Sequence, residues 1–481
     1  MNPAIRRRAV TGGWTVLVVA VLAACALLAA GPGVAAAATG VVAADPPPGA
    51  HLAGTPSALR MQFAAPVESR FIVLEFWQDG HVASLPGRID PTDPQAVIAA
   101  MRRVAGAPGQ AWVGYRVLTA DGHVVGGRYP VQVGAGGTAA PAPARLTSAA
   151  GAWLTGIGRG LALAGLVVAL GLVVLRWGIA GPAWDAGGVV GPGRPDDRAA
   201  FRGRTLTALT RGAGAWWAAW WGALGAWLLG AVLMGGGLCW WLGVGGSGLG
   251  TLLVHTRTGH AVDLLVIIAA VTALAAAVLR RRPGAARPDV RQGWGIGLGL
   301  GAAAGLVVVS WQGHASDGTD VSINITADAI HAIATAAWIG GLVGLLVLVV
   351  GPAQILAADD RVRLLAGAVV RFSSLAIASV TVLVITGTYR ALAELSSLAQ
   401  LVTTGYGIAL TVKLGIFAVM LAAGGYSRIA LHPRLERTAL GLDPDERGAS
   451  RALQASLRAE LALAAALLVA VAILVAMTPP G

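Results

Sequence analysis

The chain has 481 residues, of which 56% are hydrophobic and 12% are charged, about half the charged share of an ordinary soluble domain. A mean hydropathy of +0.70 excludes a single water-soluble globule, whose surface would need more polar residues. The formal net charge is +12, and the two cysteines can build neither a disulfide framework nor a cysteine zinc site. The composition therefore predicts several membrane helices.

Residues 1–38 have the pattern of a secretory signal peptide. Three arginines at positions 6–8 precede an apolar run at 14–30, and small residues follow at 34–38. Residues 22–25 also fit a lipoprotein cleavage box, and an uncleaved anchor is a further alternative. Each alternative predicts export of the segment that follows.

Residues 39–134 have the composition of an exported β domain. Strand-like runs lie at 59–63, 71–76 and 112–118, and turn residues such as Asp79-Gly80 and Asp121-Gly122 punctuate the segment. A length of about 95 residues with this pattern predicts an all-β Greek-key sandwich or barrel of the cupredoxin or immunoglobulin kind. Residues 135–150, rich in Gly, Ala and Pro, predict a flexible linker.

Residues 151–481 consist mainly of long apolar runs, each near the ~20 residues that cross a bilayer as a helix. Eight are expected, near 153–176, 214–238, 260–280, 294–312, 326–350, 370–390, 406–426 and 458–478. The β domain is therefore expected to precede an all-α polytopic bundle of eight transmembrane helices. Tryptophans at 216–217, 220–221 and 240–241 are expected to form interfacial belts at the two ends of the second span.

Basic residues are distributed unevenly between the predicted loops. With the β domain outside the cytoplasm, twenty arginines fall on the inner side of the spans, and only Arg257 and Arg390 fall on the outer side. Because short cytoplasmic loops are enriched in Lys and Arg, the β domain and the C-terminus are both expected outside the cytoplasm. Membrane orientation thus explains the net charge, and no nucleic-acid partner is expected.

Four histidines fall at the outer ends of spans two to five: His255, His260, His314 and His331. Neutral imidazole is a common transition-metal ligand, and ionisable groups inside a membrane mark function because they are costly to place there. Asp328 lies three residues before His331, on the same helix face, where a carboxylate could orient the ring. The alternative is that these histidines are amphipathic residues of the membrane interface.

The ligand types leave the metal open. Six methionines, one of them the initiator, are too few for a thioether route for Cu(I). Imidazole and carboxylate ligands suit Cu(II), Zn(II) or haem iron equally. The sequence contains no Walker loop, nucleophile elbow or HExxH pattern, so neither an ATP-driven pump nor a protease is predicted, and we expect no enzyme.

Two further features concern the spans. Arg159 and Lys413 lie inside them and must face a partner or water. The spacing Thr-x-x-Gly occurs at 256–259 and again at 404–407, each time before a span that runs inward. This repetition hints at an internal duplication.

Both parts of the chain resemble known families. Residues 45–52, 59–67 and 115–127 resemble the CopC copper-binding domain, and the resemblance spans the whole β segment. The membrane part resembles CopD through Gly313-His314-Ala315, Asp328 to His331 with Trp338 to Leu342, Arg371-Phe372-Ser373, Thr386-Gly387, Thr404 to Gly407 with Lys413, and Glu460 with Pro479-Pro480. The resemblance implies a CopC–CopD fusion that acts in copper transport or copper resistance.

The resemblance also implies a Cu(II) site in the β domain, from which one ligand is missing. The CopC family uses a histidine at the mature N-terminus together with the aspartate and histidine of an Asp-Gly-His motif. Asp121 and His123 match this motif, but no histidine precedes His51. We therefore expect an incomplete, weak site, and Asp121-Gly122 would also form a hairpin turn without metal.

The combined prediction is an inner-membrane or plasma-membrane protein that handles copper ions. The bundle is expected to receive copper at an outward-facing site of His314 and His331, with Asp328 as a supporting group and His255 and His260 as weaker candidates. Expected partners are copper ions, the lipid bilayer and an extracytoplasmic copper chaperone. Two alternatives stay open: an electron-transfer protein that holds haem between paired histidines, and a non-transporting protein that delivers copper to an oxidase.

Overall fold

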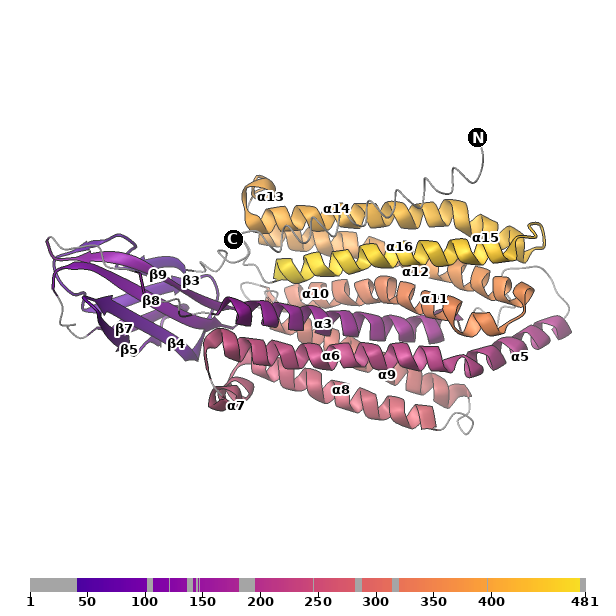
Figure 1. Cartoon of the computed structure of the whole chain (residues 1–481), viewed down its shortest axis with the longest axis horizontal. Coiled ribbons are helices and arrows are strands. Elements are labelled where there is room, and N and C mark those ends of the chain that lie inside the picture. Colours follow the sequence, from indigo (N-terminus) through magenta and orange to yellow (C-terminus); the bar gives the residue numbers. More distant parts are fainter. Residues whose placement is uncertain are drawn as a thin grey trace.

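The computed structural model describes residues 41–101, 107–120, 122–135, 142–143, 146, 148–180, 195–244, 246–281, 288–313, 320–395 and 397–475. The predicted signal peptide and much of the predicted linker lie outside these residues. A β domain lies at one end of a bundle of long helices (Figure 1). We call the adjoining end of the bundle its β-domain end and the opposite end its far end.

The β domain is the predicted sandwich. One sheet has the order β1 (Val41–Asp45), β3 (Ala58–Phe63), β7 (Asp93–Ala100) and β6 (Arg88–Asp90). The other has the order β2 (His51–Leu52), β9 (Val124–Val133), β8 (Gly109–Thr119), β4 (Val67–Gln78) and β5 (His81–Leu85). Alternate apolar residues from both sheets form one core, as expected when each sheet buries one face.

The described residues include eight helical segments that are long and apolar enough to cross a membrane, which confirms the predicted number. The first four are α3 (Ala149–Val173) with η1 (Val174–Ala180), α6 (Ala213–Leu242), α8 (Arg257–Arg281) and α9 (Pro288–Gln312). The next two are α10 (Val321–Thr335) with η3 (Ala336–Gly340) and α11 (Gly341–Val350), and α12 (Ala358–Glu394). The last two are α14 (Gly405–Tyr426) with η5 (Ser427–Leu431) and α15 (His432–Ala439), and α16 (Glu446–Val475).

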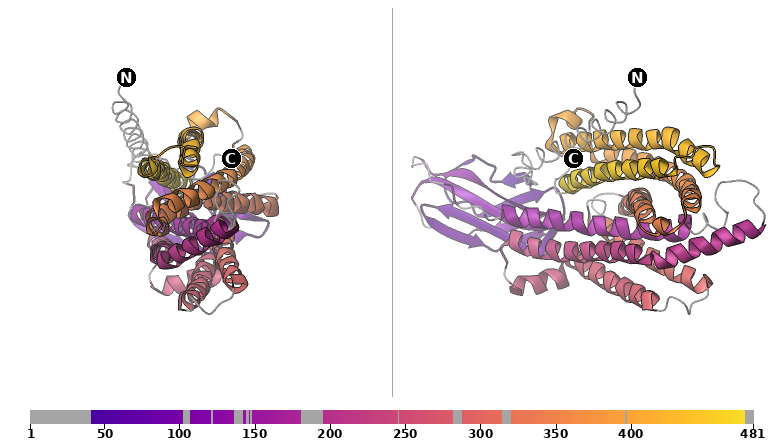
Figure 2. Two further views of the ribbon diagram at one scale, coloured as in Figure 1. Left: turned by 90° about the vertical axis from the view of Figure 1, so that its right-hand side faces the viewer. Right: turned by 45° about the vertical axis from the view of Figure 1, so that its right-hand side comes forward.

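Shorter helices mark the two ends of the bundle. At the β-domain end lie α7 (Gly246–His255) and α13 (Gln400–Thr403), whereas α5 (Pro195–Arg211) lies toward the far end (Figure 1). The turn η4 (Pro352–Ile355) packs against α5. The end-on view in Figure 2 shows the long helices gathered into one bundle. Their shared core includes residues from all eight segments.

Glycine lets α3 pack closely against its neighbours. A Cβ on Gly171 would overlap the backbone of Gly340 in η3, and one on Gly230 of α6 would overlap the backbone of α3 near Ala162. Small residues at helix crossings allow backbones to approach, as is common in membrane bundles. As a result α3 contacts both the first and the second half of the bundle.

The first half of the bundle in chain order, α3 to α9, and the second half, α10 to α16, share one local structure and one packing order. Thr256 and Thr404 both place their Oγ1 on the amide of the glycine three residues later, at 2.9 Å from Gly259 N and 3.0 Å from Gly407 N. Three contacts between helices in the first half have counterparts in the second half: α3–α6 corresponds to α10–α12, α8–α9 to α14–α16, and α3–α9 to α11–α16. This agreement supports the internal duplication, which remains a hypothesis.

The predicted tryptophan belts are wrong for Trp216 and Trp220. Only 4% and 1% of these residues is exposed, because this face of α6 points into the bundle. The Arg176 guanidinium lies 5.5 Å from the ring of Trp216. Trp240, by contrast, is 56% exposed near the β-domain end.

Candidate functional site

The β domain is packed onto the membrane helices through an apolar cluster. Phe71 of β4, Leu118 of β8 and Val124 of β9 are buried together with Leu238 and Leu242 of α6 and Leu252 of α7. Burying such side chains contributes about 1.5–3 kcal/mol each relative to exposing them. The orientation of the sandwich on the bundle is therefore set by a shared core as well as by the connecting chain.

The turn that carries the Asp-Gly-His motif lies inside this contact. Arg257 Nε donates to Ala120 O at 2.7 Å, and Arg159 Nη2 donates to Gly122 O at 3.1 Å. Glu68 Oε1 accepts from the backbone N–H of Arg257 at 3.2 Å. Gly122 has φ +79°, and a Cβ there would overlap Thr258 Oγ1, so only glycine fits both the conformation and the approach.

This placement limits access to the predicted ligands of the β domain. His123 is 5% exposed, and its carbonyl accepts from Thr119 Oγ1 at 2.9 Å. Asp121 lies outside the described residues. Two guanidinium groups next to the turn oppose the approach of a metal cation. The turn is therefore a contact between the two parts of the chain.

A second polar cluster lies within the bundle, toward its β-domain end, around His331 of α10. His331 Nδ1 lies 2.8 Å from Thr386 Oγ1 of α12, and the same hydroxyl donates to Val382 O at 2.7 Å. Since that hydroxyl has one hydrogen, His331 Nδ1–H must be the donor and Thr386 the acceptor. Nε2 is then the nitrogen that can bind a metal ion.

Asp328 has a different partner from the one predicted. Its Oδ1 pairs with Nη1 of Arg390 on α12, so Thr386 rather than Asp328 orients the ring of His331. The charges of Lys413, Arg390 and Asp328 all act on His331. Helices α10, α12 and α14 thus bring an imidazole, a hydroxyl, an ion pair and an ammonium group together within three candidate membrane spans.

The other predicted histidines are not part of this cluster in the described structure. His314 lies outside the described residues. His255 and His260 are exposed on α7 and α8, and His260 Nε2 is 3.0 Å from Val254 O. Their helices pack with α6 and α9. In the described ranges, no three His, Cys, Asp or Glu side chains gather closely enough to hold a metal.

A cavity of about 280 Å³ lies in the far half of the bundle, between η3, α11, α12, α14 and α16. Trp338 lines it and packs edge-to-face on Phe417 of α14, with ring centroids 5.9 Å apart. Its polar lining includes Ser373, Ser427, Arg428, His432 and Glu460. Sequence reasoning gave this cavity no role, although a carboxylate within an apolar span is a signal that could have found it.

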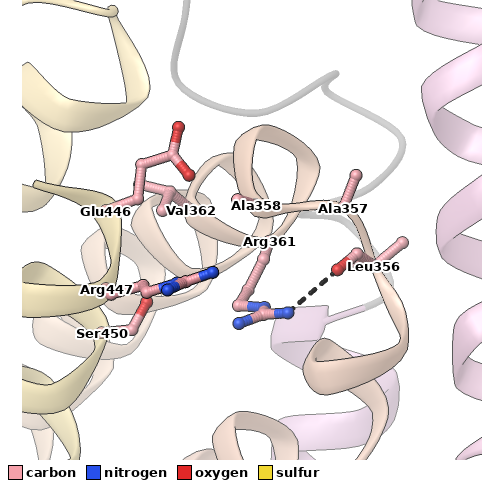
Figure 3. Close-up of a pocket in the computed structure, with 8 residues that line it drawn as sticks. All are labelled: Leu356, Ala357, Ala358, Arg361, Val362, Glu446, Arg447 and Ser450. Atoms are coloured by element: carbon pink, nitrogen blue, oxygen red, sulfur yellow. Dashed lines mark hydrogen bonds between the residues drawn. The ribbon is translucent and has the colours of Figure 1, made fainter. Parts of the chain in front are cut away.

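A further pocket lies at the far-end surface, between the start of α12 and the start of α16 (Figure 3). Its volume is about 310 Å³, and Arg361, Glu446 and Arg447 line it. Arg361 already donates to Ala353 O at 3.0 Å and to Leu356 O at 3.1 Å. These hydrogen bonds fix η4 against the start of α12, so we interpret the pocket as part of a structural contact between helices.

Comparison with known families distinguishes the two parts of the chain. Residues 41–134 match the CopC domain, and residues 366–474 match the family Copper resistance protein D. These two matches support a CopC–CopD fusion. The CopD match contains Thr386, Lys413 and Glu460, whereas His331 precedes it.

Individual relatives match shorter parts of the fusion. Copper transport protein CutJ of Bacillus subtilis (strain 168) is 30% identical over 154 residues, which is 31% of this chain and 25% of that protein. The chain thus spans a quarter of the length of this relative.

Two solved structures match the β domain. CopC from Methylosinus trichosporium OB3b is 23% identical and covers 21% of this chain and 97% of its own, with a TM-score of 0.19. Selenomethionine PcoC, a copper resistance protein from Escherichia coli, is 17% identical and covers 19% and 97%, with a TM-score of 0.17. The family matches support a role in copper handling or copper resistance.

Proposed function

We propose that this CopC–CopD fusion transports copper, and that its helical bundle receives the ion at His331. The single observation that carries the proposal is the geometry of that imidazole. Its Nδ1 is fixed by Thr386 at 2.8 Å, which leaves Nε2 for a metal ion. An ionisable ring inside a membrane span is costly and marks function by default.

A glycine and several charged groups surround His331. Gly387 faces the ring, and a Cβ at this glycine would lie 3.6 Å from His331 Cε1. The charges of Asp328 and Arg390 offset each other because the two groups are paired. Lys413 adds a positive charge, so copper is expected to need at least one further ligand, for which we propose His314.

The remaining predicted ligands belong to earlier steps of the same route. His255 and His260 are exposed near the β-domain end and could receive copper first. In the β domain, Asp121 and His123 are proposed as a weak site. It exchanges copper only when their turn moves away from the membrane helices. An extracytoplasmic copper chaperone is the proposed donor.

We place the β domain and Gly481 outside the cytoplasm of a plasma-membrane protein. Arg198, Arg202 and Arg211 on α5 lie toward the far end of the bundle, and short cytoplasmic loops are enriched in arginine. A tag at Gly481 that is labelled from outside intact cells would agree with this orientation. Labelling only after permeabilisation would contradict it.

The proposed function is tested by replacing His331 with alanine in the full-length protein. We expect loss of bundle-bound copper, measured by mass spectrometry of the purified protein, and loss of the change in cell-associated copper that the wild-type gene causes. The matched control is His81→Ala, because His81 is an exposed histidine at the start of the β5 strand, whose ring lies 3.0 Å from Asp79 O.

Unchanged copper in His331→Ala would refute the site. A parallel fall in the amount of folded protein would identify His331 as structural. A Soret band in the wild-type protein would favour the haem alternative. Reduced oxidase metallation with unchanged cell copper would favour delivery over transport.

A further inference from the structure

Glu460 is a buried carboxylate in the middle of α16, in the cavity of the far half. It is 6% exposed. Its Oε1 accepts from Ser427 Oγ at 2.7 Å and from Ser456 Oγ at 3.1 Å. Its Oε2 lies on the side of Gly424, where a Cβ would be 3.9 Å away. Within the described residues no ion pair to Glu460 is found.

The charged groups on the helices around α16 either bond to partners away from Glu460 or line the same cavity. Those directed elsewhere are Arg159 of α3, bound to Gly122 O, Arg371 of α12, bound to Gly367 O, and Arg434 of α15, paired with Asp445. Lys413 of α14 lies toward His331, and α11 has no titratable residue. Those in the cavity are Arg428 of η5, whose guanidinium donates to Ser373 Oγ, and His432 of α15.

One residue of the cavity lining, Trp338, forms an aromatic pair with Phe417 of α14. Trp338 lines the cavity and lies seven residues after His331, while Phe417 lies four residues after Lys413 on α14. The two rings pack edge-to-face, a preferred geometry for aromatic contacts. The two rings therefore lie about one to two helical turns along their helices from His331 and Lys413.

An unpaired carboxylate in an apolar cavity needs a positive partner, since burying an isolated charge is costly. Two cations could supply it: the transported copper or a proton. The Arg428 guanidinium lines the same cavity and repels a divalent ion more strongly than it hinders a proton that neutralises the carboxylate. The groups bonded to Glu460 are two serine hydroxyls, which are poor ligands for copper compared with imidazole.

We propose that Glu460 is a proton-binding site whose proton is exchanged for copper during transport. The carboxylate accepts a proton from water at the far end, becoming a neutral acid. When copper passes the Trp338–Phe417 pair, its positive charge favours the ionised form of the nearby carboxyl group, so the acid returns its proton to water. This proposal rests on the proposed copper transport and adds its coupling ion.

The test uses the full-length protein in lipid nanodiscs. Infrared difference spectra between acidic and alkaline buffer report a buried carboxylic acid directly, and an indicator dye reports protons released when a copper salt is added. The variant is Glu460→Gln, which keeps an acceptor for Ser427 and Ser456. The matched control is Glu436→Gln, on α15 and outside the cavity lining. Ser456→Ala keeps the carboxylate but removes one donor, so it should shift the frequency of the same band.

Wild type and Glu436→Gln are expected to show the carboxylic-acid band and copper-induced proton release, and Glu460→Gln is expected to lose both. If the wild-type protein binds copper but shows no carboxylic-acid band that disappears in Glu460→Gln, the proton site is refuted while the proposed copper transport is not. Equal proton release in Glu460→Gln and wild type would overturn the exchange. If wild type shows the band but binds no copper, the exchange fails together with the proposed transport.

Discussion

Replacing Arg159 and Arg257 together by alanine should release the Asp-Gly-His turn from the membrane helices. The two guanidinium groups donate to Gly122 O at 3.1 Å and to Ala120 O at 2.7 Å. Hydrogen bonds from charged groups contribute about 1.5–3 kcal/mol each, and partial exposure reduces that value. We therefore expect the double variant to lose about 2 kcal/mol of the free energy that holds the turn against the helices. The population of molecules with the turn detached should then rise roughly 30-fold.

The apolar cluster of Phe71, Leu118 and Leu242 remains in this double variant, so the β domain should stay folded and attached. The change is therefore expected to be local. Hydrogen exchange of the full-length protein measures it, because Thr119 N–H and Gly122 N–H donate within the turn, to His123 O and Thr119 O. Peptides that contain this turn should exchange faster.

Arg60→Ala is the matched control for the double variant. Arg60 is an arginine of β3 that pairs with Asp90 and Asp93 within the β domain, at 3.4 and 3.6 Å. It should leave exchange in the turn unchanged. Equal exchange of the turn in wild type and in the double variant would show that the guanidinium groups do not hold it. Faster exchange throughout the β domain would instead indicate unfolding.

Two further predictions concern single side chains. Thr386→Val should weaken copper binding by the full-length protein about 10–100-fold, as is typical when the partner that orients a histidine ligand is lost; equilibrium dialysis measures this, and unchanged affinity would contradict it. Burial raises the pKa of Tyr129, whose hydroxyl donates to Pro46 O at 3.0 Å. The β domain should therefore lose stability as the pH rises above the usual tyrosine value of about 10. Tyr129→Phe should reduce this alkaline loss in thermal melts, and Tyr115, whose pKa burial also raises, accounts for the remainder. An unchanged loss would argue against this role of Tyr129.

The sign of the Tyr129 effect follows from its environment. A raised folded-state pKa means that the neutral phenol is favoured in the folded protein, so its contribution is complete below the unfolded-state pKa and declines above it. The cost of losing the hydrogen bond itself is about 1 kcal/mol. Tyr129→Phe is therefore expected to be slightly less stable than wild type near neutral pH and less sensitive to alkali.

Much of the fold could be predicted because membrane spans and strands leave local signals. Twenty apolar residues in a row have few alternatives to a spanning helix, and Asp79-Gly80 forms the predicted turn, with φ of 48° and 76°. The Trp216 and Trp220 prediction failed because hydropathy does not reveal which face of a span meets lipid and which meets protein. Only the packing of α6 on α3 decides that.

The polar contacts could not be predicted, since they join residues that are distant in sequence. Thr386 is 55 residues from His331, and nothing local to either residue identifies the other. The expectation that Asp328 orients His331 used the only neighbour that sequence spacing offers. In the structure Asp328 instead forms an ion pair with Arg390. The sequence singled out Arg390 only as one of two arginines on the outer side of the predicted spans.

The two halves of the bundle share their packing order but differ in the chemistry they carry. The first half supplies Arg159, Arg257 and Leu242, which hold the β domain. The second half supplies His331 and Glu460, the ionisable groups of the proposed route.

If the halves arose by duplication, one copy now carries the contacts to the β domain and the other carries the proposed binding groups. Docking needs rigid contacts at one end of the helices, whereas transport needs polar groups along their length. The close approach of Gly171 and Gly340 joins the copies at the middle of the bundle. A movement of the second half during transport would therefore be transmitted to α3, and through Arg159 to the turn that carries His123.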